Sequence, residues 1–212
     1  MAVSVVLYHL RCAMELFSFI PFVPDRKTVM RRLGSQKAVF PAELDYEIDA
    51  LLKTAESSFT VKGKAAAVPA RVSAGGTLYI DETPVESKQL AKLLANSAEA
   101  YLMCASIPRR EVERINEAIS KGEGLKALVY DAYASEFVDG ALDVIIARKN
   151  AALKRTGRHL TRHRFSAGYG DLDIKYQKVF YDMLDMGTLD VQLNEQFLLS
   201  PEKSVIAVAG VE

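Results

Sequence analysis

The residues best suited to chemistry lie in one short loop, RFSAGYGD, at residues 164–171. Its arginine offers a planar guanidinium fork for a carboxylate. Its glycines let a ligand approach the backbone closely, and the face of its tyrosine ring attracts a cation. The combination suits a zwitterionic ligand with a cationic sulfur, such as S-adenosylmethionine. On these residues alone, an ordinary tight turn with a helix cap is the simpler interpretation.

Familiar catalytic and nucleotide-binding motifs are absent from the sequence. It contains no glycine-rich dinucleotide or P-loop motif and no GxSxG nucleophile motif. Cys12 and Cys104 lie in apolar runs, where we expect them to pack as inert thiols. The sequence therefore indicates neither a Rossmann enzyme nor a serine or cysteine hydrolase.

Residues 154–164 form a locally basic stretch that also holds His159 and His163. Two histidines four residues apart could supply half of a metal site, but only His9 remains as a third histidine. We favour partly exposed polar residues before a loop. The basic stretch could contact an acidic partner or a phosphate, although a solvated helix end explains it more simply.

Size and composition suit one domain over residues 1–212, as one globular body or as two closely packed lobes with a shared core. Half of the 212 residues are hydrophobic, and 27 basic residues balance 27 acidic ones, so charge indicates neither a nucleic acid nor a membrane as partner. Two scattered thiols fit the reducing cytoplasm. The apolar run at 3–23 is broken by His9, Arg11 and Glu15, which favours a core strand and its connection over a signal peptide.

The hydrophobic pattern predicts an α+β fold, because long helices alternate irregularly with strands. We expect helices at 27–33, from Pro41 onward, 86–94, after Pro108, 125–155 and 173–187, the first capped by Asp25 and the last by Asp173. We expect strands at 59–72, 77–80 and 101–107, and a final hairpin in which 191–199 pairs with 204–211.

Two sequence blocks together resemble a known family. Arg164 is followed five residues later by the tyrosine of the pair Gly168-Tyr169, and the second block contains LNEQF at 193–197, then Pro201 and Ser204-Val205. This pattern is similar to the C-terminal activation (reactivation) domain of cobalamin-dependent methionine synthase. Arg32-Leu33-Gly34 also matches a short motif of its stand-alone members, so the resemblance covers nearly the whole chain.

The resemblance implies a C-shaped α+β domain with a bent antiparallel sheet and a shallow groove for S-adenosylmethionine. By motif, Arg164 would hold the carboxylate of the ligand. The backbone of Ser166, Ala167 and Gly168 would line its path, and Tyr169 would sit beside it. Glu136 and Asp139 on the long helix are candidates for an acidic ligand contact, although an ordinary helix-surface charge is the simpler interpretation of each.

The family also implies a function. In it, inactive cobalamin receives an electron from a flavodoxin-type donor and is then methylated by S-adenosylmethionine. The DxHxxG cobalamin-binding pattern is absent from this sequence, so we expect a module that acts on a separate corrinoid methionine synthase core or related corrinoid protein. A non-catalytic binding module with the same fold is the alternative. The third hypothesis is an independent methyltransferase, for which the sequence offers no catalytic base. Whether the chain is an enzyme stays open.

Overall fold

The computed structural model describes residues 14–34 and 39–212. Its helices are α2 (Arg26–Arg32), α3 (Ala42–Ser58), α4 (Lys88–Leu93), α5 (Arg109–Ser120), α6 (Gly124–Leu153) and α7 (Tyr176–Met183), with 3₁₀ helices η1 (Lys154–Thr156) and η2 (Met186–Leu189). Its strands are β1 (Glu15–Phe17), β2 (Lys62–Val72), β3 (Leu78–Ile80), β4 (Thr83–Val85), β5 (Glu99–Ser106), β6 (Gln192–Leu193), β7 (Leu199–Ser200) and β8 (Ser204–Val211). The mixture confirms the predicted α+β class.

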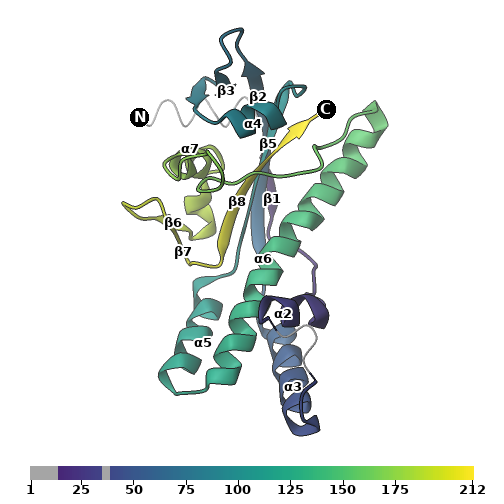
Figure 1. Ribbon diagram of the computed structural model, residues 1–212, viewed down its shortest axis with the longest axis vertical. Helices are drawn as coiled ribbons and strands as arrows, with labels where there is room; N and C mark the ends of the chain where they lie inside the picture. Colours follow the sequence, from purple (N-terminus) through teal and green to yellow (C-terminus); the bar gives the residue numbers. More distant parts are fainter. Residues whose placement is uncertain (1–13, 35–38) are drawn as a thin grey trace.

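An antiparallel sheet in the order β4-β3-β2-β5-β8, with β1 paired to β2, runs through the molecule (Figure 1). Strand β2 is long enough to pair with β1 near its start and with β3 near its end. Strand β5 lies between β2 and β8, with Ser106 opposite both Lys62 and Ser204. Strand β5 is therefore paired on both sides along its whole length, and it joins β8 to the rest of the sheet.

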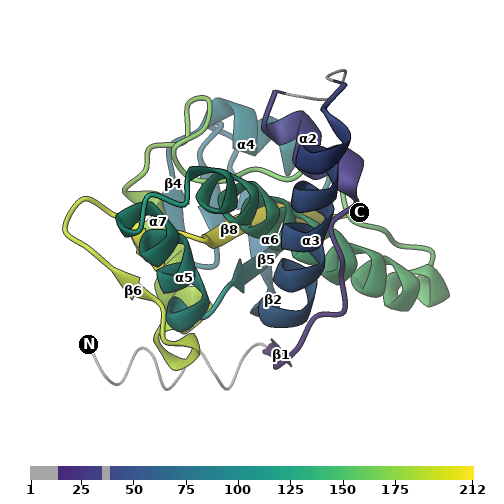
Figure 2. The same cartoon turned by 90° about the horizontal axis from the view of Figure 1, so that it is seen from below.

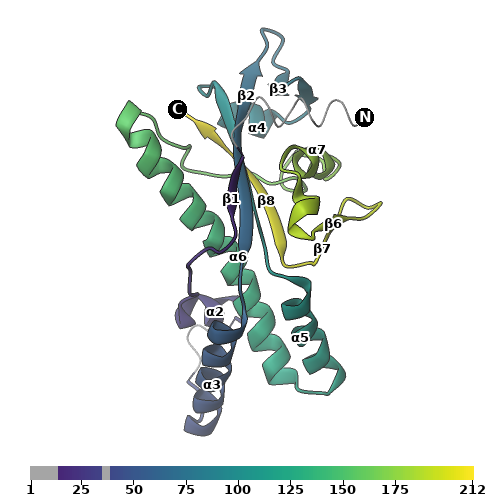
Figure 3. The same ribbon diagram turned by 180° about the vertical axis from the view of Figure 1, so that it is seen from behind.

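Both faces of β5 are buried, which explains the continuous apolar run predicted as a buried strand. Tyr101, Met103 and Ala105 face the core formed with α6, whereas Leu102 and Cys104 face the core formed with α4 and α7. Figure 3 shows the same division, with α6 on one side of the sheet and α7 with the β6–β7 hairpin on the other. Burial also raises the pKa of the Cys104 thiol to about 12.

Helices α2, α3 and α5 pack on the first half of α6, and Figure 2 shows α3 and α5 on either side of it. The predicted starts of three of these helices are confirmed. The Asp25 side chain caps α2, and Pro41 and Pro108 directly precede α3 and α5. Gly157, in the left-handed region at φ 69°, follows η1 at the end of α6.

The predicted final hairpin is wrong. Residues 204–211 form β8, but β8 pairs with β5 along its whole length, and the only pairing inside 191–200 is the short hairpin β6–β7. The predicted helix 173–187 is also shorter, because α7 ends at Met183 and Gly187 lies in η2. From Met14 onward the predicted N-terminal strand is present as β1, whereas residues 1–13, with His9, Arg11 and Cys12, lie outside the described residues.

Within residues 14–34 and 39–212, no helix combines the length and the apolar character that crossing a membrane requires.

Candidate functional site

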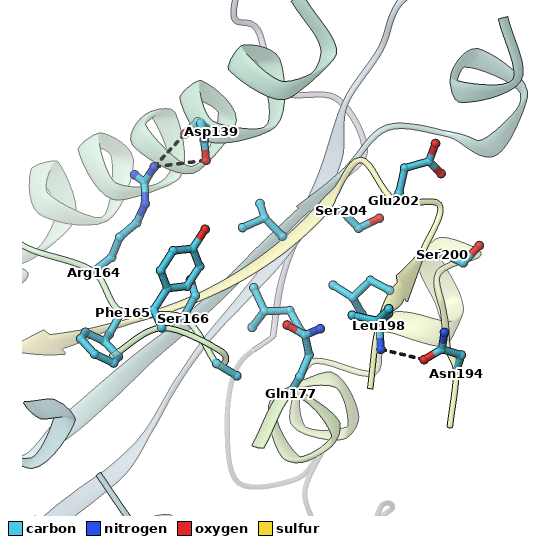
Figure 4. Close-up of a pocket in the computed structure, with 15 residues that line it drawn as sticks. Asp139, Arg164, Phe165, Ser166, Gln177, Asn194, Leu198, Ser200, Glu202 and Ser204 are labelled. Atoms are coloured by element: carbon cyan, nitrogen blue, oxygen red, sulfur yellow. Dashed lines mark hydrogen bonds and ion pairs between the residues drawn. The ribbon is translucent and has the colours of Figure 1, made fainter. Parts of the chain in front are cut away.

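A cavity of about 800 Å³ lies between α6, the loop 164–169, α7, the β6–β7 hairpin and the start of β8 (Figure 4). That volume is in the range of small-molecule sites. In Figure 4, Arg164 reaches toward Asp139 on α6, while Gln177 on α7 and Asn194 lie on the opposite side. Its lining residues are Asp139, Arg164, Phe165, Ser166, Ala167, Tyr169, Gln177, Asn194, Leu198, Leu199, Ser200, Glu202, Ser204, Val205 and Ile206.

The segment before the loop is fastened to the free edge of β8. Phe165 and Val208 exchange two backbone hydrogen bonds of 2.8 Å, and the Thr161 N–H donates to the Gly210 carbonyl at 2.8 Å. Ala167 is then buried in the core beneath α7. The loop is thus held at its start by the sheet and in its middle by the core, which places Ser166 and Tyr169 at the cavity.

Gly168 turns the loop sharply. Its φ is 87°, in the left-handed region, and a Cβ there would come within 3.1 Å of the Ile174 side chain. The Gly168 N–H donates to the Leu172 carbonyl at 2.8 Å, which closes the turn. Gly168 therefore shapes the loop, although its own atoms do not line the cavity.

Asp171 anchors the far end of the loop at the start of α4. Its carboxylate accepts hydrogen bonds from Ser87 Oγ at 2.5 Å and from the Lys88 N–H at 2.8 Å. The Ser87 hydrogen bond, with those from the backbone of Lys88 and Gln89, lowers the pKa of Asp171 below its usual range. The link between the loop and the start of α4 is therefore strongest when the Asp171 carboxylate is ionised.

Arg164 is held against α6 by two acidic residues. Its guanidinium forms an ion pair with Asp143, donates to the Asp139 carbonyl at 3.3 Å, and lies 3.8 Å from Asp139 Oδ1. Earlier in α6, Lys203 Nζ lies 2.6 Å from Asp131 Oδ1 and donates to Ser135 Oγ at 2.8 Å. Arg164 and Lys203 thus link α6 to the loop and to the segment just before β8.

Glu136 lies outside the cavity wall, and Asp139, one turn further along α6, lines it. Glu136 Oε1 is 2.7 Å from Arg32 Nε, and its side chain is only 19% exposed. Of the two acidic candidates on the long helix, the structure therefore brings Asp139 to Arg164. That Glu136 contacts a ligand stays a prediction.

Three polar residues of the opposite wall were not predicted from sequence. Gln177 Nε2 donates to the Phe197 carbonyl at 2.6 Å, which ties α7 to the hairpin. Asn194 Oδ1 accepts from the Leu198 N–H at 2.8 Å and closes the hairpin turn. With Ser200 they give this wall hydrogen-bonding groups. Only the turn-forming asparagine carries a sequence signal that could have identified it.

Two large apolar side chains of the cavity lining are left exposed. Tyr169 is 71% exposed and Leu198 is 54% exposed, although both line the cavity. Tyr169 comes from the loop 164–171 and Leu198 from the β6–β7 connection. A ligand or partner that covered them would remove apolar surface from water.

A second, shallower groove of about 480 Å³ lies on the other side of Phe165, which lines both spaces. Lys92, Arg162 and His163 line the groove, and within the described residues neither Lys92 nor Arg162 has an ion-pair partner. His159, by contrast, lies 3.6 Å from Glu212. In the part of the chain that the structure describes, no three His, Cys, Asp or Glu residues are grouped to hold a metal ion.

A scan against protein-family profiles found no match, and no curated protein matches the sequence. Among solved structures, the crystal structure of the MetH reactivation domain bound to AdoHcy is similar, with a TM-score of 0.62 and 14% sequence identity. The match covers 94% of this chain and 78% of that one. At this level of identity the similarity shows a shared fold, to which nearly the whole described chain contributes.

Proposed function

We propose that this chain is an S-adenosylmethionine-binding activation module that supports reductive methylation of cobalamin carried by a separate corrinoid protein. The observation that carries the proposal is the cavity, which brings Arg164, Ser166, Ala167 and Tyr169 of the predicted motif together with Asp139. The similar MetH domain, bound to AdoHcy, supports it. AdoHcy is what remains of S-adenosylmethionine after its methyl group has been transferred.

The donor set of the cavity fits such a ligand. The amino-acid end of S-adenosylmethionine carries one carboxylate and one ammonium group. Arg164, which is also paired with Asp143, and Asp139 offer groups of opposite charge at the same end of the cavity. The exposed ring of Tyr169 offers a face to the sulfonium or the adenine. Gln177 and Asn194 on the opposite wall offer amide groups to the polar atoms of the nucleoside.

The residues of this chain would act by binding and orientation. Reduced cobalamin supplies a strong nucleophile, and S-adenosylmethionine supplies the methyl group on a good leaving group. The protein then contributes mainly by holding the methyl donor at a fixed place and angle. The two fastened ends of the loop, at Val208 and at the start of α4, provide that rigidity.

The partner would be a corrinoid methionine synthase core or a related corrinoid protein in the cytoplasm, with a flavodoxin-type protein as electron donor. The second groove supports an acidic partner surface, because Lys92 and Arg162 lie beside the cavity and lack ion-pair partners among the described residues. Glu212 is the one acidic residue of its lining. Charge complementarity of this kind steers association and fixes orientation.

Calorimetric titration with S-adenosylmethionine tests the ligand. We expect saturable binding to the unmodified chain and a loss of about 2–5 kcal/mol of binding free energy in Arg164→Ala, by analogy with charge pairs at interfaces. Arg158→Ala is the matched control, since Arg158 is paired with Glu99 and lies outside the cavity. No binding at millimolar ligand, or equal losses in both variants, would contradict the proposal.

A second experiment separates activation from binding alone. The chain is mixed with a corrinoid methionine synthase core, a reductant and S-adenosylmethionine, and methylcobalamin formation is followed by its absorption spectrum. Methylation that depends on the chain and is lost in Arg164→Ala supports the activation module. Binding without methylation of the cobalamin would indicate the alternative, a binding module that retains the fold.

A further inference from the structure

Arg32, at the end of α2, spans two carboxylates of α6, against which α2 packs. Its Nε lies 2.7 Å from Glu136 Oε1, and its Nη2 lies 2.8 Å from Asp139 Oδ2. The two acidic residues are one helical turn apart, so both face the same side of α6. Arg32 itself does not line the cavity. It is therefore in a position to act on the cavity only through Asp139.

Asp139 divides its two oxygens between two arginines. Oδ2 is bound by Arg32, whereas Oδ1 lies 3.8 Å from Nη2 of Arg164. A guanidinium that holds one oxygen of a carboxylate fixes the direction of the other. Without Arg32, the carboxylate would be free to turn toward Arg164 and bind it with both oxygens. Arg164 would then have fewer donors for a ligand carboxylate.

We infer that Arg32 is a positioning residue, which holds Asp139 so that Oδ1 faces the ammonium group of the ligand. The N–H groups of Arg164 that Asp143 and the Asp139 carbonyl leave unused then stay available for the ligand carboxylate. The inference rests on the proposed function. It also assigns Glu136 a place as the second anchor of Arg32, outside the cavity. The Arg32-Leu33-Gly34 motif thereby acquires a role in a site formed almost entirely by residues after 138.

The test compares two ligands that differ in the relevant group. AdoHcy carries the amino-acid end, whereas 5′-methylthioadenosine has the same nucleoside and sulfur without it. In Arg32→Ala we expect AdoHcy binding to weaken about ten- to a hundredfold, as when a residue that orients a binding group is removed. Binding of 5′-methylthioadenosine should stay within about twofold. Asp139→Asn should show the same selectivity, and Glu136→Gln a smaller effect of the same kind.

Arg31→Ala is the matched control, since Arg31 is the neighbouring exposed arginine of α2 and contacts neither carboxylate. It should leave both affinities unchanged. Equal weakening of both ligands in Arg32→Ala, or no weakening of AdoHcy, overturns the inference while the proposed function stands. Failure of the unmodified chain to bind AdoHcy overturns both. If Arg32→Ala does not fold, the selectivity of Asp139→Asn and Glu136→Gln decides.

Discussion

Phe165 and Val208 exchange two backbone hydrogen bonds of 2.8 Å each, so the candidate binding loop is registered to the sheet. Alternate residues of a strand direct their backbone groups to the same edge. The backbone groups of Ile206 and Ser204, two and four residues before Val208, therefore point to the edge of β8 at which Phe165 lies. Both residues line the cavity. The loop and part of the cavity lining are therefore both attached to β8. A change in the conformation of the loop should then change the shape of the cavity.

Replacing Gly168 by alanine should weaken ligand binding as well as stability. A left-handed residue with a Cβ costs about 1–2 kcal/mol, and the new Cβ would also approach Ile174 to 3.1 Å. Gly157→Ala is the matched control, because Gly157 is also left-handed but has nothing within 4 Å of the Cβ position and lies outside the cavity. Urea unfolding and titration with S-adenosylmethionine measure the two effects.

Both alanine variants should lose unfolding free energy, Gly168→Ala more than Gly157→Ala because of the Ile174 contact, whereas only Gly168→Ala should lose affinity. Equal affinities in the two variants would show that the turn at Gly168 does not shape the site.

The tie between Asp171 and α4 should make stability depend on pH in the acid range. Its folded-state pKa is lowered, above all by the Ser87 hydrogen bond. The ionised carboxylate therefore stabilises the fold above the pKa it has when unfolded, and this stabilisation is lost as the pH falls through the lower folded value. The difference in unfolding free energy between the unmodified chain and Asp171→Asn should be constant near neutral pH and shrink below about pH 4.

Unfolding by urea at a series of pH values measures this difference. Glu195→Gln is the control, because Glu195 is exposed and has no hydrogen-bond or ion-pair partner within the described residues. A difference for Asp171→Asn that stays constant down to pH 3 would contradict the role of the ionised carboxylate.

The sequence predicted most helices because their signals are local. A capping aspartate such as Asp25, or a proline such as Pro41 or Pro108, acts within one turn of the helix it begins. The partner of a strand is not encoded locally, since alternation describes which faces are buried and not which strand lies alongside. For that reason residues 204–211 were predicted as a strand, while their pairing with β5 was not.

The candidate site likewise contains residues that the sequence could predict and residues that it could not. The motif loop could be found because Arg164, Gly168 and Tyr169 are close in sequence. The ion pairs of Arg164 with Asp139 and Asp143 depend on how α6 crosses the sheet, which no local pattern specifies. Gln177 and Asn194 reach the cavity through the packing of α7 and the hairpin, and their residue types alone are too common to mark a site.

Cys104 should not react with thiol reagents while the protein is folded. Its side chain is fully buried, and burial raises the pKa of the thiol to about 12. The thiolate is the reactive form, and at pH 8 such a thiol is ionised in roughly one molecule in 10⁴. Because Cys12 lies outside the described residues, the measurement uses Cys12→Ser. We expect a chromogenic disulfide to label no thiol in buffer and to label one thiol per chain in denaturant. Rapid labelling in buffer would mean that the sheet opens readily at β5.

Gly63→Ala should be strongly destabilising, because the glycine permits close approach of β2 and β5. A Cβ at Gly63 would lie 2.3 Å from the Cys104 carbonyl oxygen, a backbone atom that cannot move aside alone. Forcing extra atoms into a packed region typically costs about 1–3 kcal/mol. Gly75→Ala is the matched control, since its nearest neighbour would be Ser73 Oγ at 3.9 Å, and surface changes of this kind stay within about 0.5 kcal/mol. Urea unfolding of both variants measures the difference, and equal small losses would mean that the pairing around Gly63 is looser than the 2.3 Å approach indicates.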